Sequence, residues 1–211
     1  MKELHSETAT LAMGCFWGPE ALFGSLPGVV RTRTGYAGGT LADPTYRRIG
    51  DHTETIEVEF DPAVLTYEEI LRIFWNNHNP ININGYKGRQ YQSMLLYRSP
   101  GQREAIQHVL EELRASGKEE PATEIHPFTI FYPAEEKHQK YYLKRHPDAV
   151  GKLLGLYSSI SDMDRSTLAA RLNGLAKGYT NRSGIVEEVK RWPLPERERE
   201  RIIGRVKEIR W

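Results

Sequence analysis

The only cysteine of the sequence lies in the segment Gly14-Cys15-Phe16-Trp17-Gly18, between an apolar run over 8–13 and a helical pattern over 19–26. A thiol at a strand-to-helix junction faces free backbone N–H groups and the positive end of the helix dipole, which both favour negative charge. We therefore expect Cys15 to have a lowered pKa and to be a nucleophile. The alternative is a buried structural cysteine, since a free thiol often packs as a small apolar group.

An inward-facing carboxyl group is predicted at Glu54, in a strand expected over 53–60. Ile56, Val58 and Phe60 lie on one face of that strand, and Glu54 has the same parity. Buried acidic residues are unusual, and apolar surroundings raise the pKa of a carboxyl group. A thiol nucleophile beside such a group indicates attack on an electrophile while the acid protonates the departing oxygen.

Two aromatic residues, Phe16 and Trp17, follow the cysteine directly. Next to a reactive thiol they would shape an apolar pocket for a methyl or thioether group, although ordinary core packing is the alternative. A cysteine hydrolase is a competing interpretation, because His52, His78 and Asn79 could complete a triad. Composition does not separate a hydrolase from a reaction that uses Glu54 as the acid.

The histidines do not predict a metal site. Neither His52 nor His78 has a partner at His-x-His or His-x-x-x-His spacing, and Cys15 is alone. We therefore expect neither a bound metal nor a cofactor. Other polar residues that could line a site are spread along the chain: Tyr36, Tyr46, Asn79, Tyr91 and Tyr141.

Composition bounds the class of protein. The chain has 211 residues, 39% hydrophobic and 27% charged, with a net charge of +1. This near-neutral balance gives no electrostatic case for a nucleic acid or an anionic membrane as a partner, and no apolar run is long enough to span a bilayer. The N-terminus does not resemble a signal peptide. A single cysteine excludes an intramolecular disulfide, so we expect a reducing, cytoplasmic environment.

Strand and helix patterns alternate in the first two thirds of the chain. Strands are expected over 8–13, 29–37, 53–60, 92–97 and 124–131, and helices over 19–26, 67–76, 102–115 and 134–144. This order predicts an α+β fold, a two-layer α/β sandwich. The character changes after Pro147, so we expect a domain over 1–149 and a helical C-terminal extension over 150–211. No candidate catalytic residue is identified in the extension, which would either cover apolar surface or dock a partner.

The motifs around Cys15 and Glu54 resemble those of a known family, the peptide methionine sulfoxide reductases of the A type. The resemblance runs in order from about Thr8 to Pro147. Besides Gly14-Cys15-Phe16-Trp17-Gly18 with Glu20, the matching segments are Leu26-Pro27-Gly28-Val29, Thr34-Gly35-Tyr36-Ala37-Gly38-Gly39, Asp43-Pro44-Thr45-Tyr46, His52-x-Glu54, Phe60-Asp61-Pro62, Phe74-Trp75-x-x-His78-x-Pro80, Gln90-Tyr91-x-Ser93 and His138-Gln139-x-Tyr141.

The resemblance implies a ferredoxin-like core and a defined chemistry. Cys15 would attack the sulfur of methionine-S-sulfoxide, in a protein or free, and Glu54 would give the proton to its oxygen. Tyr46 and Tyr141 would donate hydrogen bonds to that oxygen. The products would be methionine and a sulfenic acid on Cys15. The residues implied in substrate binding are Phe16, Trp17, Asn79, Tyr91 and His52.

Two departures from the family pattern affect the expected chemistry. The family usually has aspartate where this chain has Asn79, and the following segment, 81–88, also differs. Without that carboxylate, the pKa of Glu54 would be raised less. The alternatives to ordinary reductase activity are therefore an altered activity, a different methyl sulfoxide as substrate, or binding without turnover. Many members also have a resolving cysteine near the C-terminus. This chain has none, so an external thiol such as thioredoxin, glutaredoxin or a small thiol must reduce the sulfenic acid.

Overall fold

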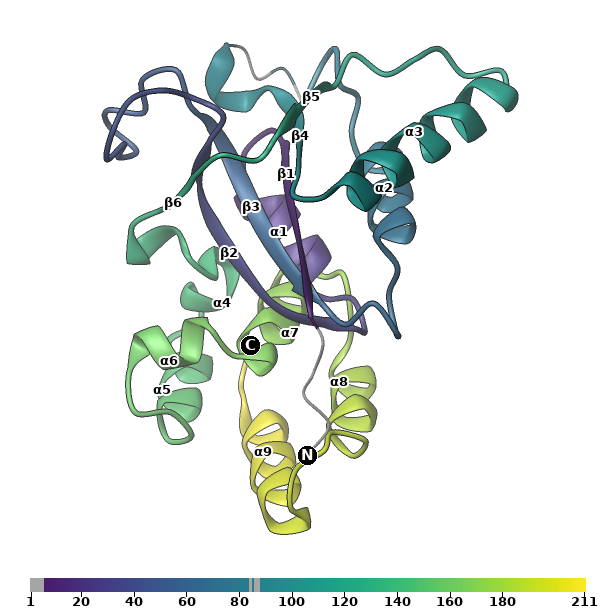
Figure 1. The fold of residues 1–211 in the computed structure, drawn as a ribbon. Helices are drawn as coiled ribbons and strands as arrows, with labels where there is room; N and C mark the ends of the chain where they lie inside the picture. Colours follow the sequence, from purple (N-terminus) through teal and green to yellow (C-terminus); the bar gives the residue numbers. More distant parts are fainter. Residues whose placement is uncertain (1–5, 84, 86–87) are drawn as a thin grey trace.

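The structure is a computed structural model that describes residues 6–83, 85 and 88–211. It is built around a six-stranded sheet in the order β5-β4-β1-β3-β2-β6, with helices α1 to α3 packed on one face and helices α5 to α9 gathered at one end (Figure 1). Residues 84, 86 and 87 of the divergent segment 81–88 lie outside the described residues. The coarse prediction of an α+β fold is confirmed.

Four antiparallel strands form the centre of the sheet. They are β1 (Glu7–Met13), β2 (Val29–Ala37), β3 (Thr53–Phe60) and β4 (Ser93–Tyr97). β1 is in the middle, where Leu11 pairs with Ile56 of β3 on one side and with Leu95 of β4 on the other. Short edge strands complete the sheet: β5 (Glu124–Pro127) runs parallel to β4, and β6 (Phe131–Pro133) pairs with β2.

One face of the sheet is apolar because alternate residues of each strand point to it. Together with α1 (Trp17–Gly24), α2 (Tyr67–Asn76) and α3 (Pro100–Ala115), this face forms the main core. α2 begins with a capping box in which Thr66 and Glu69 bond to each other's backbone N–H groups. The core residues contributed by β1 and β3 are Ala9, Leu11, Met13, Ile56, Val58 and Phe60.

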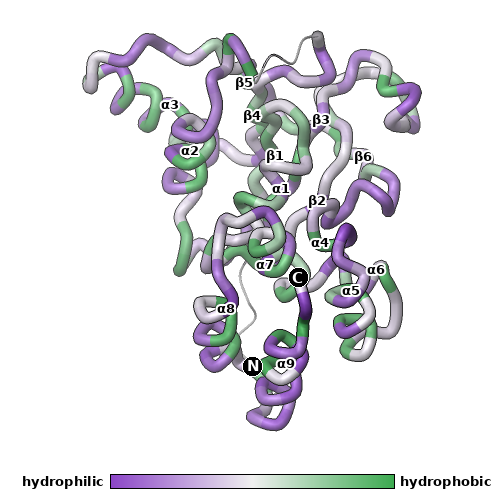
Figure 2. Tube along the Cα trace, turned by 180° about the vertical axis from the view of Figure 1, so that it is seen from behind, coloured by the Kyte–Doolittle hydropathy of each residue, from purple (hydrophilic) through white to green (hydrophobic). Residues whose placement is uncertain are grey.

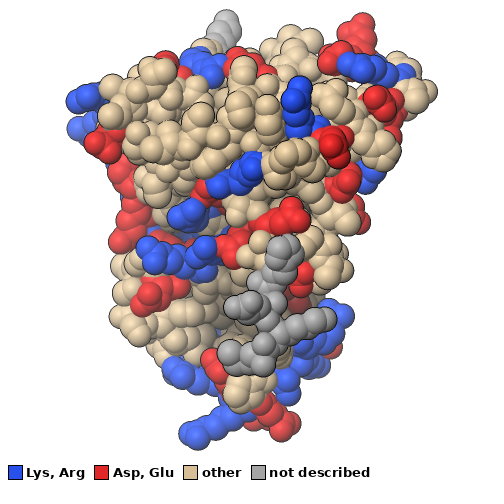
Figure 3. Space-filling model, in the orientation of Figure 1, with Lys and Arg blue, Asp and Glu red and all other residues tan. Residues whose placement is uncertain are grey.

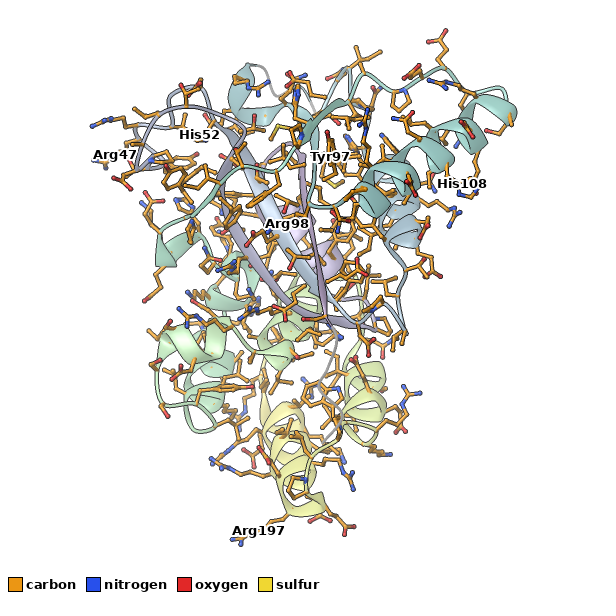
Figure 4. The ribbon with its side chains drawn as sticks, in the orientation of Figure 1. Arg47, His52, Tyr97, Arg98, His108 and Arg197 are labelled. Carbon is orange, nitrogen blue, oxygen red and sulfur yellow. The ribbon has the colours of Figure 1, made fainter. Side chains whose placement is uncertain are left out.

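The opposite face of the sheet carries charged pairs. Glu57 of β3 is bonded to both Arg33 and Arg98, and Glu59 is bonded to Arg31. Arg98 lies in front of the sheet in Figure 4, with its guanidinium 3.6 Å from the centre of the Phe128 ring. On the molecular surface seen from this side, Lys and Arg are interspersed with Asp and Glu (Figure 3).

Two predictions of local structure are wrong. The strand expected over 124–131 is two strands, β5 and β6, which lie at opposite edges of the sheet because the chain crosses its face between them. The helix expected over 134–144 is broken into a 3-10 turn, Glu136–His138, and α4 (Tyr141–Lys144). The break is at Lys140, whose φ of +51° puts it in the left-handed region and out of any right-handed helix.

The C-terminal region has its own apolar cluster, which extends from Leu143 to Ile209. Its helices are α5 (Pro147–Leu154), α6 (Ile160–Asp164), α7 (Thr167–Lys177), α8 (Arg182–Val189) and α9 (Glu196–Glu208). α9 combines hydrophilic and hydrophobic turns (Figure 2), as a helix with one buried side does. Within the described residues, no helix has both the length and the apolar character needed to cross a bilayer.

α7 packs directly on α1, the helix that follows Cys15. A Cβ atom added to Gly174 would lie 2.6 Å from the Cβ of Ser25, and one added to Gly24 would lie 2.8 Å from the carbonyl oxygen of Ala170. Glycine at these two positions lets the two helix backbones approach this closely. The C-terminal extension is therefore packed on α1, the helix that directly follows the candidate nucleophile Cys15.

A buried arginine of α7 joins the extension to the sheet domain. Arg171 is 2% exposed, and its guanidinium donates to the carbonyl oxygens of Gly24 and Val29, each at 2.8 Å. Its remaining N–H groups bond to both carboxylate oxygens of Glu188 in α8. One side chain thus satisfies the C-terminal end of α1, the start of β2 and an acid of the extension.

We predict that Arg171→Met destabilises the protein by about 3 kcal/mol or more, because it leaves buried carbonyl and carboxylate groups without partners. Urea unfolding measures the change in the free energy of unfolding. The control is Arg114→Met, which removes an exposed ion pair with Glu120 and should cost at most about 1 kcal/mol. Equal losses in the two variants would contradict a joining role for Arg171.

Candidate active site

Cys15 lies at the junction between β1 and α1, as the sequence predicted. Gly14 ends the strand with a φ of +92°, a conformation that glycine adopts without strain. Phe16 is the N-cap residue of α1, so the thiol is one residue outside the first turn of the helix. Cys15 is in no disulfide and is partly exposed. It is therefore accessible as well as close to the positive end of a helix dipole.

Glu54 is 1% exposed and lies beside Cys15. One carboxyl oxygen accepts from the backbone N–H of Phe16 at 3.0 Å, and the other accepts from Nε2 of Gln90 at 2.7 Å. The Cys15 side chain also hydrogen-bonds this carboxyl group. Burial raises the pKa of Glu54, while the bonds from Gln90, Phe16 and Cys15 lower it, and the net shift is upward. The predicted inward acid is thus in contact with the predicted nucleophile.

Aromatic rings pack together around Phe16 and Trp17, and Phe16 is 1% exposed within the main core. The Phe16 ring centre is 6.0 Å from that of Tyr36 and 5.5 Å from that of His138. The Trp17 ring stacks face to face on Tyr141, with 3.6 Å between centres and 3° between planes. The expected role of Phe16 and Trp17, to hold a methyl or thioether group, stays a prediction.

Tyr46 and Tyr91 come together over the same site. Their hydroxyl groups are hydrogen-bonded to each other, and the pKa of Tyr91 is raised by burial first and then by the nearby Glu54, Tyr46 and Cys15. Tyr46 is 36% exposed, so its ring forms the rim. Because each phenol has a single O–H donor, one hydroxyl of this pair donates to the other, and the second can donate to a polar atom bound near Cys15 and Glu54.

Tyr141 has a different environment from the one expected. Its ring stacks on Trp17, and its hydroxyl accepts a hydrogen bond from Nη1 of Arg145 at 2.9 Å. The structure therefore places Tyr141 at the site through its ring, which orients the indole of Trp17. Its predicted role as a donor to the substrate oxygen stays a prediction.

His52 is completely buried in the loop that precedes β3 (Figure 4). Its Nδ1 accepts from the N–H of Gly39 at 3.1 Å, and its Nε2 donates to the carbonyl oxygen of Leu41 at 2.8 Å. Both ring nitrogens are used to hold the loop 39–52. His52 thus positions the segment that carries Tyr46 and presents no polar atom to a substrate.

His78 and Asn79 do not assemble a triad with Cys15. Nδ1 of His78 donates to the carbonyl oxygen of Phe74 at 2.7 Å, and its Nε2 accepts from the hydroxyl of Ser93 at 2.8 Å. Neither nitrogen is available as a base for the thiol. Asn79 is exposed, and its side-chain oxygen accepts from the N–H of Ile81 at 3.0 Å within its own turn. These contacts argue against the cysteine hydrolase interpretation.

Two residues that arrange the site, Glu135 and His138, were not predicted as site residues from the sequence. Glu135 accepts from the hydroxyl of Tyr36 at 2.8 Å and from the backbone N–H of Tyr46 at 3.0 Å, and so fixes the rim loop to β2. His138 is 5% exposed, with its ring 4.7 Å from that of Tyr46, and burial lowers its pKa. His138 begins the family-like segment His138-Gln139-x-Tyr141, and Glu135 precedes it closely, so this segment was the feature of the sequence that could have indicated them.

Comparison with known proteins gives consistent matches. The family model described as "Peptide methionine sulfoxide reductase" matches residues 7–164. A peptide methionine sulfoxide reductase of Drosophila melanogaster is 43% identical over 185 residues, covering 87% of this chain and 72% of its own. The enzyme MsrA of Methanococcoides burtonii is 44% identical over 147 residues, covering 65% of this chain and 96% of its own.

Solved structures match as well. Methionine sulfoxide reductase A of Corynebacterium diphtheriae has a TM-score of 0.58 at 34% identity, covering 70% of this chain and 78% of its own. The reduced form of Mxr1 from Saccharomyces cerevisiae has a TM-score of 0.61 at 31% identity, covering 69% of this chain and 88% of its own. The match to these folds therefore covers about two thirds of this chain.

We predict that Gln90→Leu raises the pKa of Glu54 further. Gln90 donates to the carboxylate form, so its removal favours the protonated form and moves the titration to higher pH. NMR titration of the Glu54 carboxyl carbon measures the shift, with Gln107→Leu on the exposed side of α3 as the control. An unchanged or lower pKa in Gln90→Leu would contradict the assigned hydrogen bond.

Proposed function

This chain belongs to the peptide methionine sulfoxide reductase family, and on that premise we propose that it reduces methionine-S-sulfoxide, in proteins or free, to methionine. Cys15 is the nucleophile and Glu54 is the acid. The observation that carries the proposal is the contact between these two groups, a partly exposed thiol and a buried carboxyl group with a raised pKa. The protein is an oxidoreductase, with methionine sulfoxide as its oxidised substrate.

The reaction needs opposite protonation states of the two groups. Cys15 attacks the sulfoxide sulfur as a thiolate, while Glu54 gives its proton to the sulfoxide oxygen. Oxygen leaves the substrate and remains on Cys15, so methionine sulfoxide and a thiol become methionine and a sulfenic acid. The upward shift of the Glu54 pKa is in the direction that keeps an acid protonated near neutral pH.

The aromatic residues supply orientation. Phe16 and Trp17 hold the substrate methyl group, and stacking on Tyr141 fixes the Trp17 indole. One hydroxyl of the Tyr46–Tyr91 pair donates to the sulfoxide oxygen as negative charge develops on it, while the other hydroxyl donates within the pair. His52 contributes through the loop that carries Tyr46.

An external thiol completes the cycle, because the chain has a single cysteine. Thioredoxin, glutaredoxin and small thiols are the partner classes that can attack the sulfenic acid on Cys15. A reducing cytoplasm, which supplies such thiols, is the compartment we propose.

We also propose that the core is ferredoxin-like and belongs to a catalytic domain over 1–149, followed by the extension over 150–211. The order β4-β1-β3-β2 and the connection of β1 through α1 to β2, and of β3 through α2 to β4, support this assignment. The tight packing of α7 on α1 supports the extension acting as one unit with that domain.

We predict that Cys15→Ser abolishes methionine formation and that Glu54→Gln slows it by about 10²- to 10⁴-fold, the usual contribution of a positioned acid. Chromatography of released methionine measures the rates. Whole-protein mass spectrometry should show a gain of about 16 Da after one turnover in the absence of thiol. Glu111→Gln, on the exposed side of α3, is the matched control. Turnover by Cys15→Ser would overturn the proposal.

We predict that Asn79→Asp changes the turnover rate by no more than about twofold, the range of an ordinary surface substitution. The Asn79 side chain is exposed, and aspartate can also accept from the N–H of Ile81. The rate is compared with that of Asn79→Ala, which loses the acceptor. A rise of tenfold or more in Asn79→Asp would show that this position tunes Glu54 and that Asn79 limits the activity.

A further inference from the structure

A cavity opens beside Cys15, and Glu54 is not among the residues that line it. Its volume is about 260 Å³. It shares Cys15 and Trp17 with the aromatic site, but Glu54, Tyr46 and Tyr91 do not line it. Two of its lining residues, Lys177 and Tyr179, belong to the C-terminal extension, beyond residue 164, where the match to the family model ends. The sequence predicted no catalytic residue in the extension, but the structure places two of its residues in the lining of a cavity beside Cys15.

The end of α7 fixes the backbone of these two residues, whose side chains are exposed. Gly178 has a φ of +90°, and the N–H of Tyr179 bonds back to the carbonyl oxygen of Gly174 at 2.9 Å. This turn closes the helix after Lys177 and folds Tyr179 back beside it. The side-chain oxygen of Asn173 accepts from the N–H of Leu143 at 3.1 Å, which ties the same helix to α4.

Lys177 brings a positive charge to the cavity that it lines together with Cys15. Its Nζ lies 4.9 Å from the centre of the Tyr142 ring, and Tyr142 lines the same cavity. A thiolate at Cys15 helps to raise the pKa of Tyr142, so sulfur and phenol are within electrostatic reach of each other. None of the ion pairs found in residues 6–83, 85 and 88–211 involves Lys177. Its ammonium group rests over the Tyr142 ring and can also meet an anion that enters the cavity.

We propose that Lys177 forms a carboxylate-binding subsite for the small thiol that reduces the Cys15 sulfenic acid. This inference rests on the proposed function, since it concerns the second half of the same reaction. The partner class is a low-molecular-weight thiol that carries a carboxylate. The extension thus supplies a recognition residue for the reductant in a chain that lacks a resolving cysteine.

The chemistry explains why this cavity suits the thiol. A thiolate attacks the sulfur of the sulfenic acid, a sulfur–sulfur bond forms, and the sulfur–oxygen bond breaks; the departing hydroxide takes a proton and leaves as water. A second thiol then releases Cys15 and yields the oxidised disulfide of the small thiol. An incoming nucleophile approaches sulfur from the side away from the departing oxygen. Because that oxygen is held at Glu54, approach is from the cavity that Glu54 does not line.

The alternative source of the carboxylate is the sulfoxide substrate. A substrate must bring its oxygen to Glu54, which is outside the lining of this cavity, so the reacting sulfoxide group is not reduced from here. The volume of about 260 Å³ accommodates a small thiol rather than a folded protein. The observations therefore favour the thiol over an acidic residue of the substrate.

The test uses the full chain, oxidised with one equivalent of methionine sulfoxide, and follows the loss of the sulfenic acid by mass spectrometry after quenching. The probes are 3-mercaptopropionate and its neutral methyl ester. The measured quantity is the ratio of the two rate constants, in which the intrinsic reactivity of each thiol is common to every variant. The variants are Lys177→Met, Lys177→Arg and, as control in the same extension, Lys190→Met, whose lysine pairs with Glu187 at the surface.

We expect Lys177→Met to lower the acid-to-ester ratio by about two- to fivefold, the range of an exposed charge pair. Lys177→Arg and Lys190→Met should keep the wild-type ratio, and high salt should bring the wild-type ratio toward that of Lys177→Met. An unchanged ratio in Lys177→Met would refute the subsite.

Two further readouts separate this inference from the proposed function. If wild-type protein releases no methionine before thiol is added, the proposed function fails. If methionine release is normal and the ratio does not change, only the subsite fails. If Lys177→Met instead slows methionine release from a peptide with acidic neighbours and leaves the ratio unchanged, Lys177 binds substrate, and the assignment to the thiol is overturned.

Discussion

The buried ion pair between Glu20 and Lys140 is the constraint on which the arrangement of the site depends. Both side chains are 0% exposed, and Nζ of Lys140 lies 2.7 Å from one Glu20 oxygen and 2.8 Å from the carbonyl oxygen of Thr32. The other Glu20 oxygen accepts from the backbone N–H of Lys140 at 2.8 Å. Removing two charges from water costs several kcal/mol, and only such complete pairing offsets it. Lys140 is left-handed where it makes this pair, and the next residue, Tyr141, stacks on Trp17.

The C-terminal extension is part of this scaffold. Arg171 holds the end of α1 and the start of β2, while Glu20 holds the start of α1, so the helix behind Cys15 is anchored at both ends by buried charges. A helix fixed in this way keeps its dipole aligned with the thiol and leaves little freedom to the rim. This explains how residues more than 150 positions from Cys15 in the chain come to line a cavity with it.

The sequence predicted the parts of the site that depend on local periodicity. Strand alternation predicted that Glu54 points inward, and the strand-to-helix junction predicted the position of Cys15, because both signals are contained in a few neighbouring residues. Contacts between distant segments left no such signal. Gln90 reaches Glu54, Glu135 reaches Tyr36, and Lys177 reaches the Cys15 cavity only through the tertiary fold. The broken helix at Lys140 was missed for the same reason: a buried partner overrode a helical pattern.

The environment of Glu54 reconciles two demands on a general acid. Burial disfavours its charge, so the group is held toward its protonated form until substrate arrives. The N–H groups of Phe16 and Gln90 are already aimed at its oxygens, so the carboxylate that remains after proton transfer finds its donors in place. These bonds strengthen as the charge develops, which stabilises the transition state more than the ground state. Phe16 belongs to the turn that also presents Cys15. The same backbone segment therefore positions the nucleophile and receives the charge that its attack creates on the acid.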